Sequence, residues 1–235
     1  MIQLLNFSIG YADKRLIENA EAGFECGSLT ALIGRNGTGK STLLRAIAGL
    51  NPAYRGVIKI DGDDIRSLAP AIMSRRLALV TTERIRVPNF SCRDVVATGR
   101  APYTNWTGQL SDNDRTLVEQ AIKTAGIDEF ASRSIDTLSD GEAQRVMIAR
   151  AIAQHTPVII LDEPTSFLDL PSRRNLARLL HTLATENNKC IIFSTHELDL
   201  ALEFATNISL IDSGKLITLP TEAMLQSNAL DRIFR

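Results

Sequence analysis

The segment Gly34-Arg35-Asn36-Gly37-Thr38-Gly39-Lys40-Ser41 decides the fold, because of what precedes and follows it. It comes after Leu29–Ile33, whose continuous apolar run predicts a buried strand, and before Ser41–Leu50, whose pattern predicts a helix. The spacing GxxxxGK(S/T) in a strand–loop–helix context is typical of a phosphate-binding loop. Its glycines let successive backbone N–H groups point at an anion, and the helix N-terminus adds the positive end of its dipole. The loop residues Gly34, Arg35, Asn36, Gly37, Thr38 and Gly39 are therefore candidate nucleotide ligands.

Three side chains at the end of this loop carry the expected chemistry. Lys40 would reach the β- and γ-phosphates of a nucleotide as a point charge. The Ser41 hydroxyl would coordinate Mg²⁺, and Thr42 would add a phosphate contact. The sequence thus predicts a site for a nucleoside triphosphate with its magnesium ion.

Two carboxylates end a second apolar run, Val158–Leu161. Ligand sites in open α/β sheets lie outside the carboxyl ends of strands, so Asp162 is placed to hold Mg²⁺ through water, opposite Ser41. Glu163 is the candidate base that polarises the attacking water. Since adjacent residues of an unbroken strand point to opposite faces, we expect the two carboxylates to have different roles.

A second anion-binding element is predicted at Leu138-Ser139-Asp140-Gly141-Glu142. Ser139 is a plausible N-cap of a helix that runs to about Gln154, and the acidic residues after it suit a first turn. A helix N-terminus that carries Ser and Gly binds anions. One chain therefore has two phosphate-binding elements.

The rest of the 235-residue chain interleaves strand and helix patterns, which predicts an α/β fold. Arg15–Ile33 is interpreted as a β-hairpin. Residues 84–155 are mostly helical and interrupt the strand rhythm, so we expect one domain (1–235) whose core, residues 1–83 and 156–235, carries an inserted helical subdomain. A further helix is predicted to begin with a capping box at Ser111-Asp112-Asn113-Asp114. The other predicted strands are Val57–Ile60, Leu77–Val80, Cys190–Phe193 and Ile208–Ile211.

Composition excludes several classes of protein. The net charge of −1 gives no electrostatic footprint for bulk nucleic-acid binding, and we expect no nucleic-acid partner. The start of the chain lacks a secretory signal, and no apolar run reaches the length of a membrane helix. Cys26, Cys92 and Cys190 are interpreted as small buried hydrophobic residues. We favour packing over partner docking for Trp106, and a solvated face for Arg75-Arg76.

In order along the chain, these motifs resemble those of the ABC ATPases, which power ATP-binding-cassette transporters. Leu138–Glu142 is similar to the family's signature loop, Gly34–Thr42 to its Walker A loop and Val158–Glu163 to its Walker B strand. Ser166–Asp169 resembles the D-loop, and His196 the switch histidine that contacts the γ-phosphate.

The resemblance implies a P-loop NTPase core of the ABC ATPase type: a mostly parallel sheet, an N-terminal antiparallel β subdomain and the inserted α-helical subdomain. It also implies that two copies pair head-to-tail around two ATP molecules. Ser139 and Gly141 would contact the γ-phosphate of the ATP held by the other copy, and Asp169 would link the two sites. Tyr11 occupies the place of the aromatic that stacks on adenine, although it could simply pack against the hairpin.

Two positions depart from the family pattern. Thr82 stands where a Gln that contacts Mg²⁺ or the attacking water is usual, with Glu83 next to it; a threonine is too short for that contact, and Glu83 would reach the metal only if the loop shifts by one residue. Asp140 replaces a signature glycine and brings negative charge near a triphosphate, which is unfavourable unless its side chain turns away or caps the helix.

The segment Asp94–Asp114, with Gly99-Arg100-Ala101-Pro102-Tyr103, resembles the iron–siderophore, haem and cobalamin importer branch. That branch implies integral-membrane permease subunits, indirectly a substrate-binding protein, and a cytoplasmic location on the inner face of the membrane. The permease would dock in a groove near Thr82–Trp106. Two alternatives stay open: a soluble ABC ATPase, and a nucleotide-gated module that hardly hydrolyses ATP.

Overall fold

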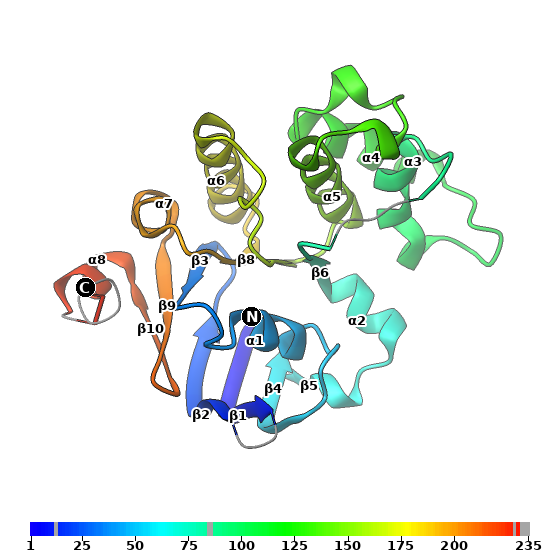
Figure 1. Ribbon diagram of the computed structural model, residues 1–235. Coiled ribbons are helices and arrows are strands. Elements are labelled where there is room, and N and C mark those ends of the chain that lie inside the picture. Colours follow the sequence, from blue (N-terminus) through cyan, green and yellow to red (C-terminus); the bar gives the residue numbers. More distant parts are fainter. Residues whose placement is uncertain (12–13, 84–86, 228, 231–235) are drawn as a thin grey trace.

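The computed structural model describes residues 1–11, 14–83, 87–227 and 229–230, which form two sheets with helices packed around them (Figure 1). The strands of the described residues are β1 (Ile2–Tyr11), β2 (Lys14–Phe24), β3 (Ser28–Ile33), β4 (Tyr54–Ile60), β5 (Asp63–Asp64), β6 (Leu77–Val80), β7 (Val158–Leu161), β8 (Cys190–Ser194), β9 (Asn207–Asp212) and β10 (Lys215–Pro220).

The two sheets differ in strand direction. The N-terminal sheet has the order β2-β1-β4-β5 and its pairings are antiparallel. The larger sheet has the order β10-β9-β3-β8-β7-β6, and only β9 and β10 pair antiparallel. A mostly parallel core sheet with an antiparallel β subdomain is therefore confirmed.

The central strands of the larger sheet are buried on both faces, and their alternate residues enter different cores. Ile159 and Leu161 of β7 face one apolar core, while Val158 and Ile160 face the other. This explains the continuous apolar runs of the sequence, because a parallel sheet covered on both sides needs apolar residues at successive positions.

Helix α1 (Lys40–Ile47) lies between the two sheets (Figure 1). Its buried Leu43, Leu44 and Ile47 belong to the same apolar core as Ile2 of β1 and Ile160 of β7. The helix ends in Ala48 and Gly49, and Gly49 adopts a positive φ of 75° that suits glycine after a helix. Packing on both sides fixes the direction of α1, and with it the loop that precedes it.

The other helices include two long ones, α5 (Asp140–Gln154) and α6 (Leu170–Thr185). Shorter α-helices are α2 (Pro70–Arg76), α3 (Cys92–Ala97), α4 (Asp112–Thr124), α7 (Leu198–Phe204) and α8 (Thr221–Gln226); the 3-10 helices are Ile65–Ser67, Thr98–Tyr103, Asp128–Phe130 and Ile135–Thr137. Within the described residues, no helix is long and apolar enough to cross a bilayer.

Between β6 and β7 the described chain is helical, and α3, α4 and α5 lie together at one side of the molecule (Figure 1). The predicted caps are confirmed: Ser111 caps α4 with Asp114 at its third position, and Ser139 caps α5 with Glu142. The exact limits 84 and 155 of the helical subdomain remain a prediction.

A buried ion pair fastens the far end of α5. Arg100 and Asp114 are only 4% and 6% exposed, and the Arg100 Nε atom lies 2.8 Å from Asp114 Oδ1. The Arg100 Nη1 atom donates to the carbonyl oxygen of Ala153, at 2.9 Å, and the guanidinium lies 4.0 Å from the ring of Tyr103. The Gly99-Arg100 sequence thus caps the helix whose other end carries Ser139.

Several expectations from the sequence were wrong. Arg15–Ile33 is not a hairpin: β2 pairs with β1, whereas β3 pairs with β8 and β9 in the other sheet. Two apolar strand patterns that follow each other closely in the sequence suggest a hairpin. In the structure, however, β3 is buried along its length and β2 only in part. The partners of β2 and β3 are therefore set by strands that are distant in the sequence, and not by the short spacing between the two strands.

Three side chains also lie in environments that the sequence did not predict. Cys26 is exposed, unlike Cys92 and Cys190. Trp106 is 96% exposed and does not pack. Arg76 is no solvated residue: its Nη2 atom lies 2.7 Å from Asp63 Oδ2 and its Nη1 atom donates to the carbonyl oxygen of Ile60.

Candidate functional site

The loop of residues 34–39 joins β3 to α1 and folds by means of its glycines. Gly37 and Gly39 adopt φ values of 76° and 106°, which side chains rarely tolerate. A Cβ atom on Gly39 would also lie 3.0 Å from the Cβ atom of Leu16, because β2 packs against the loop. Arg35, Asn36 and Gly37 are exposed, and Thr38 Oγ1 donates to the Arg35 carbonyl oxygen at 2.8 Å. The loop is thus packed against β2 at Gly39 and exposed at Arg35, Asn36 and Gly37.

Lys40 places a buried ammonium in the middle of this loop. The residue is 6% exposed, and its Nζ atom donates to the carbonyl oxygens of Gly34 and Arg35, at 2.9 and 3.5 Å. Burial lowers the pKa of Lys40, while the nearby charges of Glu163 and Asp162 oppose that shift. An ammonium held between carbonyls and carboxylates is a strong anchor for an anion that replaces the carbonyl contacts.

Asp162 joins the loop to the neighbouring strands. Its buried Oδ1 atom accepts hydrogen bonds from Ser41 Oγ at 3.0 Å and from Ser194 Oγ at 2.7 Å. Strands β3, β8 and β7 are neighbours, so their carboxyl ends bring Ser41, Ser194 and Asp162 together. A hydroxyl and a buried carboxylate at this separation are oxygen donors of the kind that Mg²⁺ prefers.

Glu163 follows Asp162 but is no longer part of the strand. Its φ is 44°, its N–H donates to Ser194 Oγ at 2.8 Å, and its Oε2 atom accepts from Ser166 Oγ at 3.1 Å. The turn brings Glu163 to the hollow that Lys40 and Ser41 line. The strict alternation of an unbroken strand therefore does not apply to the two carboxylates.

The loop, Tyr11 and Glu163 surround one hollow of about 560 Å³. Tyr11 is 57% exposed, and its hydroxyl lies 3.2 Å from Thr42 Oγ1. This side chain does not pack inside the N-terminal sheet; it stands at the edge of the hollow with an exposed ring. The arrangement has room for an aromatic base beside a phosphate-binding loop.

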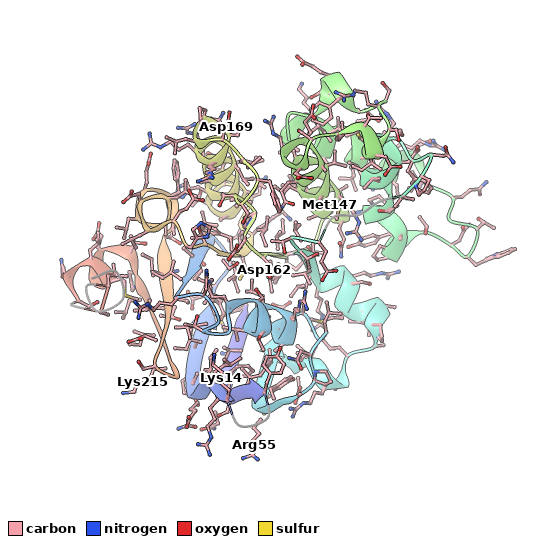
Figure 2. The ribbon with its side chains drawn as sticks, viewed as in Figure 1. Lys14, Arg55, Met147, Asp162, Asp169 and Lys215 are labelled. Atoms are coloured by element: carbon pink, nitrogen blue, oxygen red, sulfur yellow. The ribbon has the colours of Figure 1, made fainter. Side chains whose placement is uncertain are left out.

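A separate hollow of about 310 Å³ contains Ser139 and Gly141, which the sequence predicts to bind an anion. Ser139, Gly141 and Asp169 line it, and it shares no lining residue with the first hollow. Figure 2 shows Asp169 at the start of α6, away from Asp162 at the centre of the molecule. A Cβ atom on Gly141 would lie 3.1 Å from the carbonyl oxygen of Phe167, so glycine lets α5 begin against the segment before α6.

The Ser139 hydroxyl is engaged within its own helix. It donates to Glu142 Oε2 at 2.8 Å and accepts from the Glu142 N–H at 3.3 Å. The Ser139 backbone N–H also donates to Glu142 Oε2, at 2.9 Å; this bond, the bond from the Ser139 hydroxyl and the nearby charge of Arg133 lower the pKa of Glu142. The capping box keeps a carboxylate within the turn that the sequence assigns to phosphate binding.

Thr82 and Glu83 follow β6 and lie beside α5. They line a hollow of about 180 Å³ together with Asp140 and Gln144. The Oε1 atom of Glu83 accepts from Arg45 Nη2 at 2.8 Å. In this structure the Glu83 carboxylate therefore faces α1, and its role as a metal ligand stays a prediction.

His196 is exposed, two residues beyond the Ser194 that contacts Asp162. Sequence reasoning missed Ser194 and Glu197, on either side of it. Glu197 accepts from Thr165 and Arg173. A polar residue at the carboxyl end of an otherwise apolar strand was the signal for Ser194; no local pattern marked Glu197.

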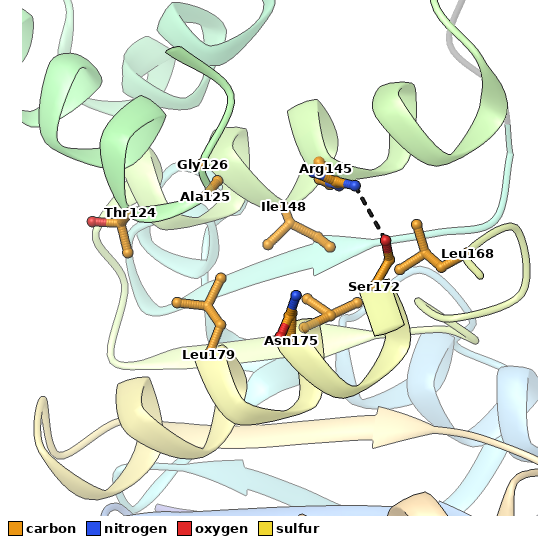
Figure 3. A pocket seen from close by; sticks show the side chains of 10 residues that line it. Thr124, Ala125, Gly126, Arg145, Ile148, Leu168, Ser172, Asn175 and Leu179 are labelled. Carbon is orange, nitrogen blue, oxygen red and sulfur yellow. Dashed lines mark hydrogen bonds between the residues drawn. The ribbon is translucent and has the colours of Figure 1, made fainter. Parts of the chain in front are cut away.

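The seam between α5 and α6 is only partly packed. Arg145 Nη2 donates to Ser172 Oγ at 3.3 Å across it, beside a cavity of about 250 Å³ lined by Ile148 and Leu179 (Figure 3). The hollow with Ser139 lies along the same seam, since Arg145 and Ser172 line both. The position of Ser139 relative to Asp169 thus depends on how α5 rests on α6.

Comparison with known proteins gives a consistent result. Residues 17–166 match the ABC transporter family. The chain is 36% identical to the achromobactin transport ATP-binding protein of Dickeya dadantii, over 95% of this chain and 83% of that one. It is 36% identical to the hemin import ATP-binding protein of Nocardia farcinica (94% and 76%), and 35% identical to the cobalamin import ATP-binding protein of Halobacterium salinarum (92% and 54%).

Solved structures agree in fold. A chain from an ABC transporter assigned to the metal-chelate type, in an inward-facing conformation, has a TM-score of 0.86 and 27% identity and covers 99% of this chain and 88% of its own length. A dimeric ATP-binding cassette with ADP and phosphate bound has a TM-score of 0.82 and 25% identity (94% and 99%). Because residues 17–166 match the family and relatives at 36% identity cover most of the chain, this protein belongs to the ABC transporter family as an ATP-binding cassette.

Proposed function

We propose that this chain binds and hydrolyses ATP with Mg²⁺ as the ATPase subunit of a membrane importer. The observation that carries the proposal is the hydrogen bond between Ser41 Oγ and Asp162 Oδ1, beside the buried Lys40 ammonium. Together they offer one cation for phosphate oxygens and an oxygen pair for a metal. The hollow next to them has room for the base at Tyr11.

Each residue has one task in this proposal. Lys40 exchanges its carbonyl contacts for phosphate oxygens, and the loop N–H groups hold the remaining charge. Ser41 and Asp162 would hold Mg²⁺, which neutralises charge on the β- and γ-phosphate oxygens when bound. Glu163, fixed by Ser194 and Ser166, accepts the proton of the attacking water. His196 contacts the γ-phosphate.

The second half of each site comes from a second copy of the chain. The hollow with Ser139 and Gly141 shares no residue with the phosphate-loop hollow, which supports a head-to-tail pair in which each copy completes the other's site. A related cassette is dimeric with ADP and phosphate bound. ATP then stabilises the pair, and hydrolysis releases it.

The proposed partner is an integral-membrane permease that holds two copies at the inner face of the cell membrane, with a substrate-binding protein acting indirectly. The names of the relatives support import of a metal chelate: achromobactin, hemin or cobalamin. The 96% exposed Trp106 is available for contact with the permease.

The test is Glu163→Gln in the full chain, with the exposed Glu129→Gln as the matched control. Glu163→Gln is expected to bind ATP, lose at least about 10²-fold in turnover and accumulate as a dimer with Mg-ATP in gel filtration. Wild-type turnover in this variant, or failure of wild-type protein to bind ATP, contradicts the proposal. Active protein that does not co-purify with a permease from membranes would favour the soluble ATPase instead.

A further inference from the structure

The Glu197 side chain joins two segments that follow neighbouring strands. Its Oε1 atom accepts from Thr165 Oγ1 at 2.7 Å, and its Oε2 atom accepts from Arg173 Nη1 at 2.9 Å. The Nε atom of Arg173 also donates to the carbonyl oxygen of Leu168 at 2.7 Å. We call Thr165, Arg173 and Glu197 the Glu197 clamp.

The clamp is partly buried, so its hydrogen bonds contribute more to stability than bonds on the open surface would. Thr165 is 2% exposed, and the side chains of Glu197 and Arg173 are 17% and 31% exposed. Charge-assisted hydrogen bonds are roughly twice as strong as neutral ones, and partial burial limits screening by salt. The next residue of α6 offers a contrast: the Arg174–Glu203 pair is 55% and 42% exposed, the kind of pair that contributes little.

The segments that the clamp joins carry three residues of the proposed mechanism. Thr165 lies two residues after Glu163, the Leu168 carbonyl group directly precedes Asp169, and Glu197 directly follows His196. On the other side of His196, Ser194 Oγ donates to Asp162 and accepts from the Glu163 N–H. His196 is therefore held between two contacts to the segment that follows β7.

We propose that Glu197 and Arg173 are positioning residues that hold His196, Glu163 and Asp169 in register for ATP hydrolysis. The proposal rests on the ATPase function proposed above and adds residues that none of the motifs contains. Because Asp169 lies in the hollow of the second half-site, the same clamp ties the histidine of one ATP site to the segment that faces the other. A misplacement of about 1 Å in such a site lowers the rate by up to about 10²-fold.

The test compares Glu197→Gln with Arg174→Gln in the full chain. Glu197→Gln keeps the side-chain shape but removes the charge that Arg173 pairs with, whereas Arg174→Gln removes the neighbouring exposed ion pair of the same helix. For Glu197→Gln we expect kcat to fall at least about tenfold with KM for Mg-ATP within about threefold. Arg174→Gln should match wild type in both constants. Arg173→Lys, which cannot bridge Leu168 and Glu197 with one planar group, should resemble Glu197→Gln.

A second measurement needs no activity. Hydrogen exchange of the peptide spanning residues 164–169 in the nucleotide-free protein should speed up several-fold in Glu197→Gln and stay unchanged in Arg174→Gln. Normal kcat together with normal exchange in Glu197→Gln overturns the clamp, and so does a kcat loss that disappears when activity is counted per folded molecule. Wild-type protein without ATPase activity refutes the proposed function, while the exchange result still decides whether the clamp holds these segments.

Discussion

Asp114→Ala is expected to destabilise the protein by about 3–5 kcal/mol, because it leaves the charge of Arg100 buried without its carboxylate. The pair is 4% and 6% exposed, so water cannot replace the lost partner. Arg100 would keep only the carbonyl oxygens of Ala153 and Gln154 and the ring of Tyr103. The loss would fall on the helical region that carries Ser139.

Part of the effect belongs to the helix cap and not to the ion pair. Asp114 Oδ2 also accepts from the Ser111 N–H and Oγ atoms, at 3.0 and 2.6 Å. Ser111→Ala is therefore the matched control: it removes the cap hydroxyl at a cost of about 1 kcal/mol and leaves the ion pair intact. The double variant Arg100→Met/Asp114→Ala removes both charges and is expected to be more stable than Asp114→Ala alone.

The assay is equilibrium denaturation in urea at pH 7, with thermal unfolding as a second measurement. For a chain of 235 residues, about 2–4 °C per kcal/mol gives a Tm lower by about 6–20 °C. Hydrogen bonds from Ser111 and the contact with Arg100 lower the pKa of Asp114. Its contribution is thus complete above the unfolded pKa of about 3.9 and is lost only as pH falls through the folded value. A loss no larger than that of Ser111→Ala, or a double variant less stable than Asp114→Ala, would refute the reasoning.

Lys40→Ala should abolish useful ATP binding because the loop loses its central cation, and normal affinity in a nucleotide titration would contradict this. Thr82→Gln should leave ATPase turnover within several-fold of wild type; a large loss would mean that the loop around Thr82 has a geometry of its own. A thiol reagent at pH 8 should modify one cysteine quickly, the exposed Cys26, since Cys92 and Cys190 are buried and burial raises the pKa of Cys190 to about 12. Three fast thiols in the folded protein would show that the described burial is wrong, and a denatured sample serves as the control.

Local sequence patterns predicted most helices and strands of this fold, but they could not predict which strands pair with each other. The strands Leu77–Val80 and Val158–Leu161 occur as predicted, because continuous apolar runs of that length suit a sheet covered on both faces. The prediction of a hairpin at Arg15–Ile33 was wrong because no feature of that segment indicates that β3 pairs with β8 and β9.

In the candidate site, too, motif spacing predicted some features, whereas others depend on contacts between distant segments. Motif spacing predicted that Ser41 and Asp162 would lie together, although 121 positions separate them. The turn at Glu163 could not be predicted, since a positive φ at a glutamate depends on the Ser194 hydroxyl that holds its N–H group. The exposure of Trp106 was missed because composition does not say whether an aromatic side chain has neighbours.

The capping box at Ser139 bears on how two copies would meet. In the isolated chain the Ser139 hydroxyl donates to Glu142, so a phosphate that binds this hydroxyl must replace the Glu142 carboxylate as the acceptor of its hydrogen bond. It must also approach a turn that carries the negative charge of Glu142, which Arg133 offsets only in part at 3.4 Å. The phosphate-loop hollow differs, because the buried ammonium of Lys40 lines it beside the carboxylate of Glu163. The two halves of the proposed site are therefore unequal: nucleotide should bind first at the Lys40 loop, and closure on a partner's Ser139 should be the weaker, second step. In a transporter whose permease holds the two copies close together, the high effective concentration of one copy near the other favours such a weak step.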